Sequence, residues 1–167
     1  SNLGLMYYSL DRLEEAIAAH RRAVELAPND HLAWSNLGDA LWIDGRRDEA
    51  RQAFQTAQEL ARSALQVNPN NAGYLMDLAW ITAMLDHAEE ARRLIGRARA
   101  RSPDDPYVHY YDGLIWLRGG DADAAIAAFG TAAAQGYSAQ MLTADPQLTA
   151  LRADPEFARV VSSAKTR

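Results

Sequence analysis

Apolar residues in this chain recur every three to four positions, and turn-forming residues interrupt them at intervals. The segment from Ala50 to Val67 has no Gly or Pro, and its small and apolar residues share one helical face: Ala53, Phe54, Ala57, Leu60, Ala61, Ala64 and Leu65. This spacing predicts one amphipathic helix. Turns are predicted between such segments, at Pro28-Asn29-Asp30, Asp44-Gly45, Pro69-Asn70-Asn71, Leu85-Asp86, Pro103-Asp104-Asp105-Pro106 and Gly119-Gly120-Asp121. We therefore predict an all-α fold of helices joined by short turns.

The composition supports helices over strands. The 167 residues include 33 alanines but only 17 valines, isoleucines and threonines together, and alanine loses no side-chain entropy in a helix. The length is sufficient for one domain, or for a short array of repeats, with a substantial core.

Small and turn-forming residues recur at fixed distances along the chain. Gly38 follows Gly4 after 34 residues, and Pro103 follows Pro69 after 34. Between these pairs the step is 41, as from Pro28 to Pro69. The seven additional residues make two helical turns, so the longer step keeps the same helical face. An internal repeat of helix pairs is therefore predicted.

The residues at these steps resemble the tetratricopeptide repeat (TPR), a pair of antiparallel helices that pack through small residues. The second copy matches the pattern most fully: Trp34, Leu37, Gly38, Leu41, Ala50, Phe54 and Ala57. The resemblance implies an α-α superhelix, or TPR solenoid, of helix-turn-helix repeats over residues 1–135. The units are a truncated 1–30, then 31–71, 72–105 and 106–135.

The seven-residue extension belongs to the second helix of unit 31–71. It is either a tolerated insertion or a protruding helix that meets another domain.

Residues 136–167 follow a different pattern. Gly136 is suited to ending a helix, and Asp145-Pro146 and Asp154-Pro155 each place a capping carboxylate before a proline. We predict two short C-terminal capping helices that cover the last unit with Leu148, Leu151, Phe157 and Val160. This segment resembles the one that closes TPR arrays at the C-terminus of large bacterial signalling proteins. Ser1 falls inside a predicted helix, so we expect the sequence to be the C-terminal array of a larger bacterial protein.

Composition and motifs argue against several function classes. With no cysteine and a formal charge of −5, we expect no thiolate chemistry and no general affinity for nucleic acid or anionic lipid. The sequence has no apolar run long enough to cross a bilayer and no histidine pair with zinc-site spacing. Acid, base and nucleophile do not converge at any motif. We therefore predict a non-enzymatic, cytoplasmic protein with no cofactor, no metal and no membrane partner.

Two features depart from a plain helical repeat. The first is a group of arginines on the outer helix of unit 72–105: Arg92, Arg93, Arg97, Arg99 and Arg101. We interpret them as a solvated face in which Glu89 pairs with Arg93, and nucleic-acid binding is the less favoured alternative. The second is Asp112, at a position where the family has a buried leucine. It requires a partner such as a tyrosine hydroxyl, or it faces a ligand.

In TPR arrays the first helix of each pair lines a concave groove, and the resemblance assigns the groove residues of this chain. Most of them are aromatic or apolar: Tyr8, Asn36, Asp39, Trp42, Met76, Trp80, Met84, Tyr107, Tyr110, Tyr111 and Leu114. The resemblance implies a protein-protein interaction module that binds a peptide or helical segment there, from another chain or from its own upstream domain. Only Asn36 matches the family's carboxylate-binding positions, so we expect no carboxylate clamp.

Alternatives remain open at this point. The chain would instead be an oligomerisation or spacer module if a homodimer formed through its edge and groove. In another alternative the C-terminal helices or a tighter superhelix fill the groove, and Trp80 and Tyr110 then belong to the core. In an open groove, Trp80→Ala is expected to remove partner binding with little change in stability.

Overall fold

The computed structural model describes residues 12–164 and contains only helices and turns over that range. The helices are α1 (Leu13–Leu26), α2 (His31–Ile43), α3 (Arg47–Val67), α4 (Ala72–Met84), α5 (Ala88–Arg101), α6 (Pro106–Arg118), α7 (Ala122–Ala134), α8 (Ala139–Ala144) and α9 (Pro155–Ser163), with a 3₁₀ helix, η3 (Pro146–Leu151), before α9. The predicted all-α fold is confirmed. Tyr8 and Gly4 lie outside the described residues.

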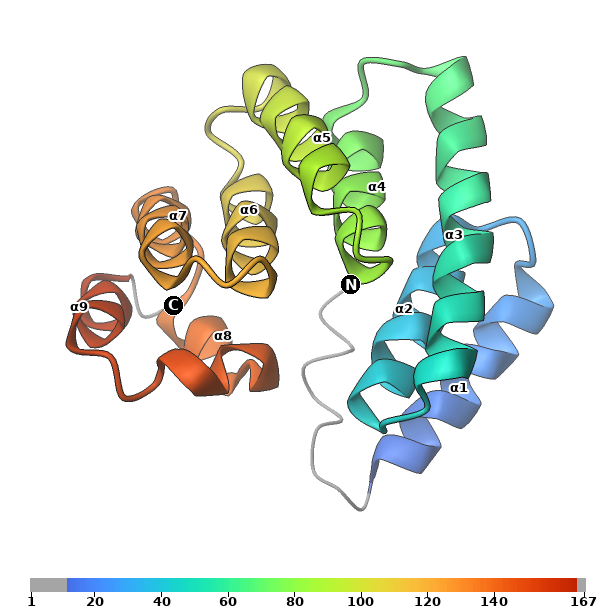
Figure 1. The fold of residues 1–167 in the computed structure, drawn as a ribbon, viewed down its shortest axis with the longest axis horizontal. Helices are drawn as coiled ribbons and strands as arrows, with labels where there is room; N and C mark the ends of the chain where they lie inside the picture. Colours follow the sequence, from blue (N-terminus) through green and yellow to red (C-terminus); the bar gives the residue numbers. More distant parts are fainter. Residues whose placement is uncertain (1–11, 165–167) are drawn as a thin grey trace.

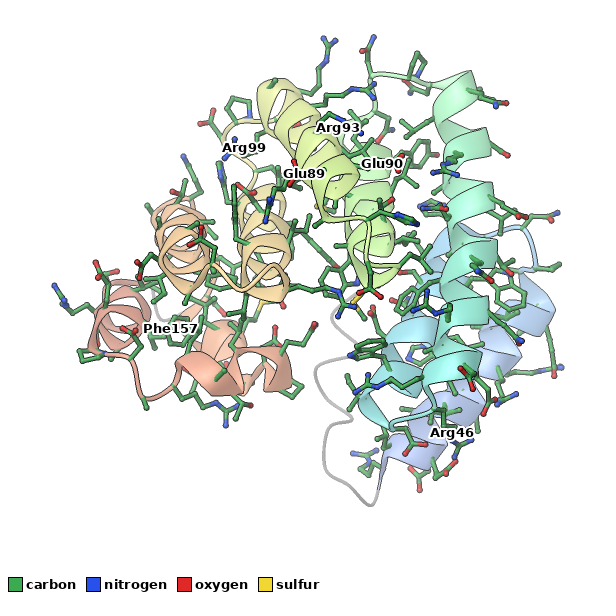
Figure 2. All side chains as sticks on the ribbon, viewed as in Figure 1. Arg46, Glu89, Glu90, Arg93, Arg99 and Phe157 are labelled. Atoms are coloured by element: carbon green, nitrogen blue, oxygen red, sulfur yellow. The ribbon has the colours of Figure 1, made fainter. Side chains whose placement is uncertain are left out.

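Consecutive helices form antiparallel pairs that stack side by side (Figure 1). The pairs are α2 with α3, α4 with α5, and α6 with α7, and neighbouring pairs pack through α3 with α4 and through α4 and α5 with α6. Helix α1 packs against α2, and Arg46, labelled in Figure 2, pairs with Glu14 of α1. The first helices α2, α4 and α6 therefore follow one another along one side of the array.

The turn inside each pair has the same backbone design. Gly45, Asp86 and Gly120 adopt positive φ angles of 84°, 67° and 83°. The next residue then donates a backbone hydrogen bond back to the last turn of the preceding helix, as from Arg46 N to Leu41 O at 3.0 Å. This geometry ends a helix while satisfying its free carbonyls. The 34- and 41-residue spacing of the turn signals thus corresponds to a repeated helix-terminating motif.

The joins between pairs supply the caps of the first helices. The side chains of Asp30, Asn71 and Asp105 accept hydrogen bonds from the backbone N–H groups of Leu32, Tyr74 and Tyr107. A short polar side chain at this position satisfies one of the free N–H groups at a helix start.

The two helices of a pair approach most closely where the first carries a glycine. A Cβ atom on Gly38 would lie 2.7 Å from Cε1 of Phe54, and one on Gly113 would lie 2.5 Å from Cε1 of Phe129. Both phenylalanines are fully buried. In the α4–α5 pair the equivalent residues are Ala79 and Ile95, also buried, so a larger residue on one helix accompanies a smaller one on its partner.

Helix α3 accounts for the longer step in the repeat. It has 21 residues against 14 in α5 and 13 in α7. Its last turns extend past the beginning of α2 (Figure 1), and Val67 at its end is 88% exposed.

Residues after 135 close the array with one more helix than expected. The predicted short helices are η3 and α9, whose N-caps are Asp145 and Asp154; the additional helix is α8. Phe157, labelled in Figure 2, places its ring 6.1 Å from that of Phe129. Leu148, Leu151 and Phe157 are buried, which removes the apolar side of α7 from water.

Two of the five outer arginines, Arg92 and Arg99, pair with acids. Arg92 donates to Glu89 at 2.7 Å in place of the expected Arg93, and Arg99 donates to Asp112 at 2.8 Å. Figure 2 labels Glu89, Arg93 and Arg99 on α5 and at its end. Asp112 is 2% exposed, so its partner is this arginine and not a tyrosine hydroxyl. Burial raises the pKa of Asp112, and the charge of Arg99 opposes that shift.

Gly113→Ala is expected to lower the free energy of unfolding by about 1–3 kcal/mol, because its Cβ would overlap the buried ring of Phe129. Gly96→Ala in α5 is the control, since a Cβ there meets no atom within 4 Å. It should raise stability by up to about 1 kcal/mol. Urea unfolding of both variants measures the difference, and equal effects would contradict the close approach described above.

Candidate functional site

Two cavities lie on the side of the array formed by the first helices. The first, which we call the acidic cavity, has a volume of about 560 Å³. It is lined by four aspartates and four tyrosines, together with further residues of α2 and α4: Asp39, Asp77, Asp105, Asp145, Tyr107, Tyr110, Tyr111 and Tyr137. The second cavity, about 410 Å³, is lined by Trp42, Ile43, Arg47, Trp80, Met84, Leu114, Leu117, Arg118, Pro146 and Gln147.

The boundary between the two cavities is made by Trp80 and Gln147, which line both. Gln147 belongs to η3, so the segment after residue 135 reaches the concave surface and divides it.

The structure brings the predicted groove residues together, apart from Tyr8, which lies outside the described residues. Seven line the acidic cavity: Asn36, Asp39, Met76, Trp80, Tyr107, Tyr110 and Tyr111. Trp42, Met84 and Leu114 line the second cavity, as Trp80 also does.

Four of these residues are more buried than an open groove would allow. Trp80 and Met84 are each 4% exposed, Tyr110 is 7% exposed and Leu114 is 3% exposed. They form the floor of the cavities and part of the core. Trp42, Met76 and Tyr111 remain partly exposed, and Tyr107 is 42% exposed.

Trp80 is held in place by contacts across three helices. Its indole Nε1 donates a 3.0 Å hydrogen bond to Oδ1 of Asp39 on α2. Its ring meets that of Tyr111 on α6 edge to face, with centroids 6.0 Å apart. Trp80 therefore joins the first helices of three successive pairs, as the alternative that places it in the core requires.

Tyr110 is covered by the segment that follows α7. Its ring stacks on Tyr137 at 4.5 Å and 10°, and its hydroxyl donates to Oδ2 of Asp145. Residues after 135 thus fill the part of the groove above Tyr110 and leave the two cavities beside it.

Burial shifts the pKa values of the ionisable groups around the acidic cavity. It raises the pKa of Asp39 to about 7, against the effect of the Trp80 hydrogen bond and with a further upward contribution from Asp145. Burial also raises the pKa of Asp145 and lowers that of His20. Desolvation disfavours the charged form of each group.

In the second cavity, arginine side chains lie over an aromatic ring. The guanidinium carbons of Arg47 and Arg118 are 3.7 Å and 4.6 Å from the centroid of Trp42. Arg118 also donates to the carbonyl of Ala83 at 2.7 Å and to Asp86 at 2.7 Å. These contacts fix the wall of the cavity and give it positive charge.

Sequence reasoning missed the cavity residues that do not belong to a first helix. These are His20, Arg47, Asp105, Tyr137, Met141, Asp145, Pro146 and Gln147. For Asp105 and Asp145 the sequence showed only a helix cap before proline, a signal for local structure that does not indicate which surface the segment covers.

Between residues 12 and 164, no set of three or more histidine and acidic side chains is placed to hold a metal ion. Over the same range, no helix combines the length and apolarity required to cross a membrane.

Comparison with known protein families decides the nature of the repeat. Family models described as TPR repeat or tetratricopeptide repeat match residues 4–45, 31–64, 52–110 and 85–140. The chain carries tetratricopeptide repeats. With the stacked helix pairs, these matches identify the fold as a TPR solenoid, which is consistent with protein-protein interaction.

The proteins that are similar to this chain in sequence are much longer than it is. A peroxisomal targeting signal receptor of Candida glabrata is 32% identical over 120 residues, covering 67% of this chain and 20% of the receptor. The BBSome complex member BBS4 of Xenopus tropicalis is 26% identical over 126 residues, covering 75% of this chain and 23% of that protein. The chain spans less than a quarter of the length of these curated relatives.

Similar solved structures include MamA, with a TM-score of 0.46 and 17% identity over 98% of this chain and 92% of MamA. The TPR protein TTC0263 of Thermus thermophilus has a TM-score of 0.43 and 19% identity, over 97% and 95% of the two chains.

Trp80→Ala is expected to lower the free energy of unfolding by about 3–5 kcal/mol, because it leaves a cavity among three packed helices. Leu32→Ala is the control. Leu32 lines the same cavity but is 43% exposed, so its loss should cost less than about 1 kcal/mol. Chemical denaturation tests both. A Trp80→Ala variant as stable as the native chain would restore the exposed-anchor interpretation.

Asp39→Asn should change how stability depends on pH. The pKa of Asp39 is about 7 in the folded chain, against an ordinary value of 3.8. Between these two pH values the folded chain keeps a proton on Asp39 that the unfolded chain has lost. The native chain therefore gains stability relative to the variant, on the order of 2 kcal/mol, as pH falls from about 7 towards 4. Urea unfolding of both proteins across this range measures the gain, and a difference independent of pH would contradict it.

Proposed function

We propose that this chain is a non-catalytic protein-binding module that takes an extended or helical segment of a partner across its concave surface. The observation that supports this most directly is the pair of adjacent cavities along the first helices of three successive repeats. Their volumes of about 560 and 410 Å³ suit side chains of a bound segment.

The binding residues are those that line the cavities and keep exposed surface. They are Trp42, Met76, Tyr107 and Tyr111, with Asn36 and Asp39 as polar contacts. Partly exposed aromatic side chains contribute strongly when a partner covers them. Trp80, Met84, Tyr110 and Leu114 act in this proposal as the floor that holds them. Tyr8 is included from its repeat position alone.

The relatives are compatible with this role. The receptor of Candida glabrata is named for a peroxisomal targeting signal, and we carry over only the idea that the repeats recognise a protein segment. The partner here is another chain or an upstream domain of the same protein.

The proposal also covers the organisation of the chain. It includes four units over 1–135 with capping helices over 136–167, a larger bacterial parent protein and a cytoplasmic location.

The test uses peptides selected from a phage-displayed random dodecapeptide library on the immobilised chain, with affinities measured by fluorescence anisotropy. Trp42→Ala and Met76→Ala should each weaken binding at least about tenfold, because each removes apolar surface that a partner would bury. Trp34→Ala is the matched control: Trp34 lies on the same helix as Trp42, is also partly exposed, and contributes to neither cavity.

Circular dichroism verifies that each variant is folded. Failure to select any peptide, or equal binding by all three variants, would contradict the proposed function. Light scattering over a concentration series decides between peptide binding and self-association, since a chain that dimerises without selecting peptides favours the oligomerisation role.

A further inference from the structure

Negative charge is concentrated in the acidic cavity. Asp39, Asp77, Asp105 and Asp145 line it, and the described lining contains no lysine or arginine. The remaining group able to carry positive charge in that lining is His20, and burial lowers its pKa, which favours the neutral imidazole. The described part of the chain therefore places no resident cation in the cavity to balance its carboxylates.

Three of these carboxylates have only neutral hydrogen-bond donors among the described residues. Asp39 accepts from the indole of Trp80, Asp105 from its own helix start, and Asp145 from the hydroxyl of Tyr110 and the backbone of Gln147. Arg152 donates to the backbone oxygens of Thr143 and Asp145, and its charge lowers the pKa of Asp145 against the effect of burial. Asp77 differs, since it pairs with His31 at 3.0 Å.

Some aspartates elsewhere on the molecule pair with arginine. Asp44, Asp86 and Asp112 each lie within 3.3 Å of an arginine nitrogen. In the part of the chain that the structure describes, Asp39, Asp105 and Asp145 form no such ion pair.

Uncharged polar groups in the cavity also lack partners. Ser35 is 5% exposed and lines the cavity, yet its hydroxyl forms no hydrogen bond with any described residue. The side chains of Asn36 and Tyr111 line the cavity without such a bond to the described residues as well. Among the described residues only Arg92 Nε is a buried side-chain polar atom without a partner, so the Ser35 oxygen keeps accessible surface in the cavity. This oxygen is an acceptor suited to an N–H group that enters the cavity.

The remaining lining suits the stem of a long basic side chain. Met76 and the tyrosine rings provide apolar contact, and ring faces attract a lysine or arginine head group. The second cavity has the opposite character, because Arg47 and Arg118 line it and its described lining includes no acid. A basic side chain of a partner is therefore favoured in the acidic cavity and disfavoured in the second cavity, on the other side of Gln147.

We propose that the acidic cavity receives a lysine or arginine side chain of the bound protein segment. This inference rests on the proposed function and specifies the chemistry of the partner. Carboxylates around a partly desolvated ammonium or guanidinium form charge-assisted hydrogen bonds, which are stronger than neutral ones. The raised pKa of Asp39 agrees with a carboxylate whose counter-charge comes from outside the chain.

The experiment compares two double variants that remove the same charge. Asp39→Asn/Asp105→Asn removes two of the four carboxylates that line the cavity while keeping an acceptor for Trp80 and a helix cap at residue 105. Asp121→Asn/Asp154→Asn is the control, because both residues are helix caps outside the acidic cavity. Binding of the selected dodecapeptides is measured at pH 8, where Asp39 is ionised.

The expected result is that the selected peptides share a lysine or arginine and bind the cavity variant about 10- to 100-fold more weakly. The control variant should bind within about twofold of the native chain. Replacing the shared basic residue of the peptide by norleucine should weaken binding to the native chain but add little loss to the cavity variant.

Peptides that bind through Trp42 and Met76 without a basic residue, or that bind the cavity variant unchanged, would overturn this inference and leave the proposed function in place. A selection that yields no peptide contradicts both. If the cavity variant does not fold, the norleucine substitution on the native chain decides, since an unchanged affinity would refute a bound cation.

Discussion

The close contact between the two helices of each pair sets the geometry on which the concave surface depends. The ring of Phe54 lies against the backbone at Gly38, and that of Phe129 lies against Gly113. With no Cβ between them, the helices are fixed in distance and in rotation. Repeating this contact turns the cavity-lining faces of α2, α4 and α6 to the same side, and that is why residues 41 positions apart, such as Asp39 and Trp80, can share a hydrogen bond.

The sequence was sufficient for the repeating part of the fold, because that part depends on local signals at fixed spacing. Turn residues such as Asp44-Gly45, capping residues such as Asp105 and small residues such as Gly113 each act within a few positions. The state of Trp80 and Tyr110 could not be predicted in the same way. Their burial depends on Tyr137 and on η3, which belong to a segment without periodicity whose path across the groove is set by tertiary packing.

The two sides of the molecule use charge in different ways. On the outside, pairs such as Arg92 with Glu89 are exposed to water and contribute little stability. In the acidic cavity, the carboxylates of Asp39, Asp105 and Asp145 accept hydrogen bonds only from neutral donors among the described residues, and burial of such charges lowers the stability of the fold. Proteins tolerate such arrangements at binding surfaces because the rest of the core provides sufficient stability. The buried phenylalanines and alanines of the helix pairs have that role here.

The position of Gln147 on the boundary of both cavities has a consequence for how such arrays evolve. Solenoids commonly change length by duplication of whole units. A unit inserted directly after α7 would move η3 away from Trp42 and Trp80, join the acidic cavity to the second cavity and expose Tyr110. Extension of the array directly after α7 would therefore alter both cavities.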